Sequence, residues 1–174
     1  MTNRCVSLDF IGVYMDLRVR KYVLYRVRKK ENDRKYLIKL KQYRDQMKQD
    51  IIDESPDYMD GQPRGKGKTG DVTQRKALRL VDVDRRIERI EKELAAIQNV
   101  EDKINNMWSY DRKGKRVNLA LDMYNETIKK ECTDLTAKAQ LMNIGRRQLI
   151  QGRARLLEMF AVELGEYINI EEFK

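Results

Sequence analysis

Apolar side chains recur every three or four residues along most of this chain, the spacing that gathers them on one face of an α-helix. The longest run predicts a helix over residues 71–108, opened by Asp71, with Gln74 three residues later completing a capping box. Glu101 interrupts this run, and Trp108 ends it. Its apolar residues fill the a and d positions of a coiled-coil-like seam: Leu80, Val83, Ile87, Ile90, Leu94, Ile97 and Ile104.

The same spacing of apolar residues over positions 1–53 predicts a basic, helical N-terminal region. Their apolar stripes are Phe10, Val13 and Leu17, then Tyr36, Leu40, Tyr43, Met47 and Ile51. Residues 22–28 suit a helix or a strand, and we favour a helix. The pattern leaves open whether Asn32 and Asp33 break this helix. It also leaves open whether the seam pairs with residues 36–51 of its own chain or with a second copy, since the same heptads serve both arrangements.

The C-terminal third, residues 113–167, predicts a compact helical domain. A polar break at residues 110–115 precedes a helix whose stripe is Val117, Leu121, Tyr124 and Ile128. Residues 134–160 then match a helix-turn-helix. Its small crossing residue and its three apolar anchors fall on Ala139, Met142, Ile144 and Leu149.

The turn residues of this segment agree with that interpretation. Asp134 can cap the first helix, and Asn143 occupies the place where the backbone must be left-handed, which Asn tolerates. Gly145 takes the N-cap position of the second helix, which we expect to run to Gly165. An acidic tail, residues 168–174, follows.

The charges of residues 135–157 suggest a function for the predicted helix-turn-helix. From Leu135 to Leu157 there are five basic side chains and no acidic one. If the second helix buries its apolar stripe, its first turn presents Arg and Gln side chains of the kind that read base edges in a major groove. The candidate DNA-binding residues are Lys138, Arg146, Arg147, Gln148, Gln151, Arg153 and Arg155. The alternative interpretation is a surface helix of a bundle with a solvated basic face.

Composition argues against several classes of protein. The chain has 174 residues, a net charge of +9, no histidine, and two cysteines, Cys5 and Cys132, without metal-ligand spacing. A zinc site and a His-dependent active site are therefore not expected, and neither is any other metal or cofactor. Because no apolar run is long enough to span a membrane, we expect a cytoplasmic protein. The helical spacing of the apolar residues predicts an all-α fold, and we expect that the protein is not an enzyme.

Residues 54–70 form a linker that contains both prolines and four of the nine glycines. Within it, Gly67, Lys68 and Thr69 resemble the end of a phosphate-binding P-loop. Gln62 stands where the first glycine of that motif belongs, and no strand leads into it. We therefore set aside a nucleotide-driven enzyme.

The layout resembles the RinA/ArpU-type regulators of phages and prophages. The resemblance rests on the spacing of Pro56, Asp60, Gly61, Pro63, Gly65 and Gly67, on the Gly-Asp-Val-Thr of residues 70–73, and on the helix-turn-helix, which is similar to the fourth region of primary sigma factors. It implies an activator of late phage genes in the nucleoid of a bacterial host. Three departures, Lys138, Gly145 and Gly152, each imply a weaker helix-turn-helix.

Two functions follow as hypotheses. The first is a sequence-specific transcriptional regulator that binds double-stranded DNA, with host RNA polymerase as a further partner. The second is a phage DNA-packaging or assembly component that oligomerises through its seam. The sequence specifies neither the operator nor the number of copies.

Overall fold

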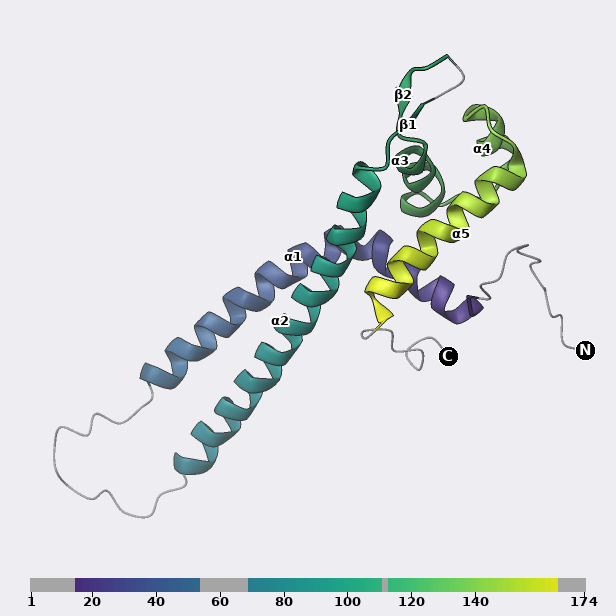
Figure 1. Ribbon diagram of the computed structural model, residues 1–174. Coiled ribbons are helices and arrows are strands. Elements are labelled where there is room, and N and C mark those ends of the chain that lie inside the picture. Colours follow the sequence, from purple (N-terminus) through teal and green to yellow (C-terminus); the bar gives the residue numbers. More distant parts are fainter. Residues whose placement is uncertain (1–14, 54–68, 111–112, 166–174) are drawn as a thin grey trace, which may run out of the picture. The chain divides into compact units, whose positions relative to one another are not determined.

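The protein is mostly helical, as the all-α prediction requires. In the computed structural model, the described residues are 15–53, 69–110 and 113–165, without the side chains of residues 53 and 69–73. Two long helices, α1 (Leu17–Asp53) and α2 (Thr69–Asn105), come first along the chain (Figure 1). α1 is continuous through Asn32 and Asp33, and residues 22–28 are helical, as favoured.

Several sequence predictions fall outside the described residues. They concern the linker up to position 68, the acidic tail, and the side chains of Cys5, Phe10, Val13, Asp71 and residues 54–68. α2 begins at Thr69, two residues before the predicted start. Trp108 was predicted to end the same helix, but α2 stops at Asn105, so that prediction is wrong.

Two compact units divide the described chain, and each long helix contributes to both. Residues 31–94 form one, here named the paired-helix unit. The other, here named the core unit, takes the residues up to Lys30 and those from Ala95 onward. The division therefore cuts across the regions that sequence pattern had outlined, because one long helix can pack against different neighbours along its length.

Within the paired-helix unit, α1 and α2 run side by side in opposite directions (Figure 1). Ion pairs join them: Lys41 Nζ lies 2.7 Å from Glu91 Oε1, and Arg44 Nη1 lies 3.9 Å from Asp84 Oδ1. The Arg86 guanidinium lies 5.3 Å from the centre of the Tyr36 ring. These contacts pair the two helices within one chain.

The seam residues are shared between the two units. Leu80, Val83, Ile90 and Leu94 of the paired-helix unit are half-buried, while Ile87 is buried. Ile97 and Ile104 belong to the hydrophobic core of the core unit. One heptad pattern therefore serves two packing environments.

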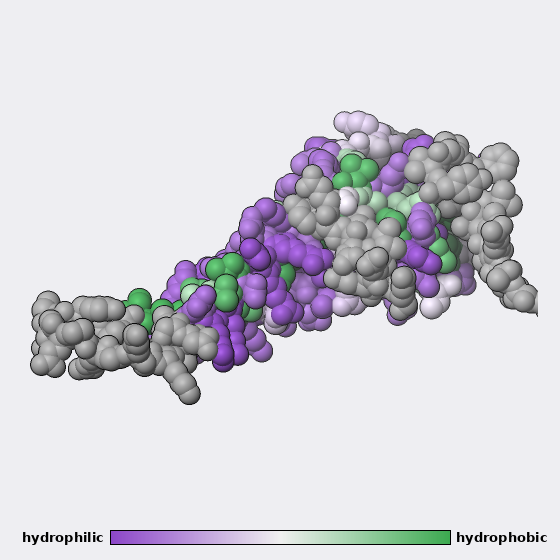
Figure 2. All heavy atoms as spheres, turned by 90° about the horizontal axis from the view of Figure 1, so that it is seen from below, coloured by the Kyte–Doolittle hydropathy of each residue, from purple (hydrophilic) through white to green (hydrophobic). Residues whose placement is uncertain are grey.

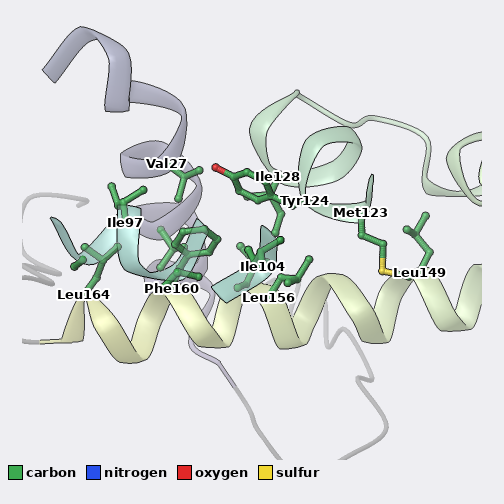
Figure 3. Packing of buried hydrophobic residues seen from close by; sticks show 14 of the residues in the cluster. Val27, Ile97, Ile104, Met123, Tyr124, Ile128, Leu149, Leu156, Phe160 and Leu164 are labelled. Carbon is green, nitrogen blue, oxygen red and sulfur yellow. The ribbon is translucent and has the colours of Figure 1, made fainter. Parts of the chain in front are cut away.

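The core unit collects several shorter elements around one hydrophobic cluster. They are β1 (Ser109–Tyr110), β2 (Arg116–Val117), α3 (Leu119–Tyr124), the π-helix η2 (Asn125–Lys129), α4 (Leu135–Leu141) and α5 (Arg146–Glu163). Figure 3 shows Val27 of α1 and Ile97 of α2 facing Phe160 of α5 and Leu164, which directly follows α5. The Tyr124 and Phe160 rings stack with their centres 5.6 Å apart.

A polar junction lies beside this cluster. The Tyr124 hydroxyl donates to Glu101 Oε1 at 2.5 Å, and the Lys30 ammonium forms an ion pair with the other oxygen of the same carboxylate. Lys30 also donates to Gln98 Oε1 at 2.9 Å. Burial, with the hydrogen bond to Glu101, raises the pKa of Tyr124. The acid that interrupts the heptads thus ties α1, α2 and α3 together.

The predicted polar break is a β-hairpin. β1 pairs with β2 in antiparallel register, Ser109 opposite Val117 and Tyr110 opposite Arg116. Gly114, with φ of 73°, supplies the left-handed residue of the loop. Trp108 lies at the base of the hairpin, and the Arg116 guanidinium stacks 4.3 Å from its ring centre.

Asn118 fixes the base of this hairpin. Its buried side-chain amide donates to the carbonyls of Ile104 at 2.8 Å and Asn105 at 3.0 Å, while its oxygen accepts from the N–H of Leu121 at 2.9 Å. One side chain therefore satisfies the end of α2 and the start of α3 together.

The helix predicted from Val117 begins at Leu119 and widens into η2. Thr127 is fully buried, and its hydroxyl donates to the carbonyl of Met123 at 2.7 Å. That bond competes with regular α-helical pairing at the same carbonyl. The N–H of Lys130 reaches the carbonyl of Asn125, five residues earlier, at 3.3 Å.

Gly152 of α5 lies against the side chain of Met123. A Cβ at this position would lie 2.3 Å from the sulfur and 3.0 Å from the terminal carbon of Met123, so a larger residue here requires the end of the Met123 side chain to move. The helix-propensity loss of roughly 0.5–1 kcal/mol that the resemblance implied for Gly152 stays a prediction, and the contact with Met123 is a second effect that opposes replacing this glycine.

We expect the gain in helix propensity from Gly152→Ala, roughly 0.5–1 kcal/mol, to be offset in the wild-type background, since the new methyl group displaces the end of the buried Met123 side chain. In a Met123→Ala background the same substitution should be neutral or stabilising by roughly 0.5–1 kcal/mol. Urea denaturation of the four proteins of this cycle measures both values. Equal effects in the two backgrounds would contradict the close-approach explanation.

Candidate nucleic-acid interface

A hydrogen-bonded turn redirects the chain from α4 into α5. The N–H of Ile144 donates to the carbonyl of Ala139 at 3.0 Å, and the N–H of Asn143 donates to that of Gln140 at 3.0 Å. This pair of bonds is the Schellman pattern of a helix C-terminus. Asn143 has φ of 53°, so the predicted left-handed residue is confirmed.

The start of α4 is also as predicted. The Asp134 carboxylate accepts from the N–H groups of Thr136 at 2.8 Å and Ala137 at 3.1 Å, and it caps the helix. Because α4 has only seven residues, this cap and the turn at its other end supply much of its local stability.

The four residues expected to anchor this segment all pack inward. Ala139 and Leu149 are buried in the hydrophobic cluster, and Met142 and Ile144 lie against it. Leu156 and Phe160 continue the buried face of α5, with Gly152 between Leu149 and Leu156. In Figure 3, Leu149 lies beside Met123 at one end of the row and Leu164 lies at the other. The orientation of α5 is therefore set by core packing.

The opposite side of α5 begins with a cationic, polar turn. Arg146, Arg147 and Gln148 are exposed at the N-terminus of the helix, and Gly145 is the N-cap residue, as predicted. Gly145 has no side chain to accept from the first N–H groups of α5. These groups and the positive end of the helix dipole favour an anion here.

Further along α5, Arg155 is exposed and Gln151 is half-buried. Gln151 lies four residues after Arg147, so one turn separates them on the helix surface. The structure therefore places Arg146, Arg147, Gln148, Gln151 and Arg155 on the accessible part of one helix.

Lys138, which was expected to contact the DNA backbone, is engaged in an ion pair within the chain. Its ammonium forms an ion pair with Glu126, whose carboxylate also accepts from Lys130 at 2.6 Å. The hydrogen bonds from Lys130 and Lys138 lower the pKa of Glu126 from its ordinary 4.5 to about 2. This cluster joins α4 to η2.

Arg153 differs most from its predicted role. Only 9% of its surface is exposed, so it belongs to the buried residues rather than to the accessible face. Its Nε atom has no hydrogen-bond partner among the described residues. Burial, with the charge of Arg20 nearby, lowers the pKa of Arg153. Arg153 is therefore not among the accessible side chains of α5.

Comparison with known proteins adds no relative to this picture: no family model, no curated protein and no solved structure matches the chain. Among the described residues, no helix has the length and apolar content needed to span a membrane. The same residues contain no group of three or more acidic or cysteine side chains placed to hold a metal ion.

Sequence reasoning missed the hairpin and its anchor, Asn118. A signal for the hairpin was present: Gly114 lies in a short polar stretch, a composition typical of the loop between two strands. No signal of equal strength marked Asn118, because its partners Ile104 and Asn105 lie more than ten residues away.

We expect Lys138→Ala to raise the pKa of Glu126 from about 2 part of the way toward 4.5, because Lys130 still stabilises the carboxylate. The stability from these ion pairs is present above the ordinary carboxyl pKa and is lost as the pH falls through about 2. NMR titration of the Glu126 carboxyl measures the midpoint. Lys129→Ala, an exposed neighbour, is the control, and an unchanged midpoint in Lys138→Ala would contradict the assignment.

Proposed function

We propose that this chain is a sequence-specific DNA-binding transcriptional regulator in which α4, the turn and α5 act as a helix-turn-helix. The observation that carries the proposal is the exposed, cationic start of α5 on a helix whose other face is buried in the core. A recognition helix needs that combination, because its leading turn must enter a groove while its orientation stays fixed.

The chemistry of the exposed side chains supports DNA as the partner. The Arg146 and Arg147 guanidinium groups can pair with phosphate or with the acceptor edge of guanine, and Gln148 and Gln151 can read adenine. The N-terminus of α5 adds N–H donors for a backbone phosphate. Arg155 extends the positive charge along the helix. Each phosphate neutralised should add about −0.9 to the slope of log K against log salt.

The resemblance to RinA/ArpU-type regulators refines this proposal. It rests on the linker and on residues 134–160, and it suggests activation of late phage genes in the cytoplasm of a bacterial host, with RNA polymerase as a further partner. In the described part of the chain, its helix-turn-helix component is supported by the Asn143 turn and by the buried Ala139 and Leu149.

We expect Arg147→Ala with Gln151→Ala to weaken binding to a DNA duplex selected from a random pool by about 10-fold or more, since a bidentate base contact contributes about 1–3 kcal/mol of discrimination. Fluorescence anisotropy at fixed salt measures the affinity, and circular dichroism checks that helix content is unchanged. The matched control removes an exposed Gln and Arg from α2, Gln74→Ala with Arg79→Ala. Equal affinity in both variants would place the interface elsewhere.

A second function, a DNA-packaging or assembly component that oligomerises through coiled-coil pairing, is favoured by one observation. The paired-helix unit leaves large apolar side chains exposed among charged ones, including Ile38, Ile52 and Leu78 (Figure 2). A second copy could cover them.

Light scattering combined with size-exclusion chromatography separates the two functions. A regulator should be a monomer or a dimer, and a packaging component should form a closed ring of many copies. We expect a monomer or a dimer. If the protein is a dimer, Ile38→Glu with Leu78→Glu should shift it toward monomer, while the exposed pair Lys39→Glu and Arg79→Glu should have less effect. A ring would overturn the regulator proposal.

A further inference from the structure

Every described side chain from Asn105 to Arg116 is exposed, although this segment includes a tryptophan and a tyrosine. Tyr110 is 75% exposed and Trp108 is 51% exposed. Only Val117, the last residue of β2, is half-buried. The β1–β2 hairpin therefore contributes almost nothing to the hydrophobic core, and its residues need another explanation.

The hairpin is nevertheless firmly attached. Asn118 binds the last carbonyls of α2 and the first turn of α3 through three hydrogen bonds, which fixes the point where the hairpin leaves the core unit. The Ser109 hydroxyl also donates to the carbonyl of Val117 at 3.3 Å, across the strand pair. An exposed element on a rigid base is suited to contacting a partner.

The described hairpin residues are cationic and aromatic. Lys113, Lys115 and Arg116 supply three positive charges within four positions, and Gly114 lets the chain turn tightly between the lysines. Arg116 stacks on Trp108, which holds the guanidinium in place with its edge available. Cations beside exposed aromatic rings match the phosphates and sugars of a nucleic acid backbone.

The position of the hairpin agrees with this chemistry. Figure 1 shows β1 and β2 at the same end of the core unit as α4 and the start of α5. All these elements belong to the core unit, so a duplex lying at that end could meet both.

We propose that the β1–β2 hairpin is a second DNA-binding element, which contacts the sugar-phosphate backbone next to the base pairs contacted by α5. The inference rests on the proposed function and adds a separate contact to it. Lys113, Lys115 and Arg116 bind phosphates, and they contribute affinity and salt dependence without selecting the sequence.

The test compares three proteins on the duplex selected by the wild-type chain. The hairpin variant is Lys113→Ala, Lys115→Ala and Arg116→Ala. The matched control, Lys39→Ala, Lys48→Ala and Arg79→Ala, removes the same charges from exposed positions of the paired-helix unit. We expect the hairpin variant to bind about 10-fold more weakly and to flatten the slope of log K against log salt by about 2–3. Its sequence preference and melting temperature should stay unchanged, and the control should match wild type.

The single tryptophan provides a direct readout, since Trp108 lies at the base of the hairpin. Adding the duplex should change its emission in wild type, and less so in Lys113→Ala with Lys115→Ala, which leaves the Arg116 stack intact. Unchanged affinity and salt slope in the hairpin variant, with unchanged emission in wild type, would overturn the hairpin proposal and leave the α5 proposal standing. Wild type that binds no duplex would overturn both. An effect confined to binding of RNA polymerase would assign the hairpin to a protein partner and overturn DNA contact.

Discussion

The buried face of α5 holds the rest of the candidate interface in place. Leu149, Leu156, Phe160 and Leu164 are almost completely removed from solvent, and each such side chain contributes roughly 1.5–3 kcal/mol when fully buried. Their neighbours come from both long helices and from α3. Since these contacts fix the rotation of α5 about its own axis, they decide which of its side chains face outward.

Two polar residues, Asn118 and Glu101, join segments of the core unit through specific hydrogen bonds and an ion pair. Asn118 pairs with backbone groups at two helix ends, and an unsatisfied buried group of that kind would cost about 1–3 kcal/mol. Glu101 accepts from Tyr124 and pairs with Lys30, so a carboxylate within an apolar seam has two partners. Both residues join segments distant in sequence. They fix where α3 begins and how the helix ends meet, and the hairpin depends on that arrangement.

Both units contain ion pairs between basic and acidic side chains. In the paired-helix unit, basic and acidic side chains pair across and along the helices, as Lys41 does with Glu91 and Lys92 with Glu88. Exposed pairs of this kind contribute little stability, about 0–1 kcal/mol each, and they keep the surface nearly neutral. In the core unit, Lys103 pairs with Glu163 and Lys138 with Glu126, and exposed basic side chains also lie at the start of α5 and on the hairpin. The proposed DNA contacts depend on these exposed cations.

The amino-acid pattern alone determined the helical class, the long helices, the capping role of Asp134, the left-handed Asn143 and the inward residues of α5. Each of these depends on side chains a few residues apart, where local backbone geometry and helical periodicity decide the outcome.

Only the tertiary structure decided the rest. It buried Arg153, paired Lys138 with Glu126, placed Gly152 against Met123, and brought Asn118 to the end of α2. It also divided one heptad seam between two units. These features arise from contacts between segments distant along the chain, and periodicity within one segment carries no information about which neighbour will face it.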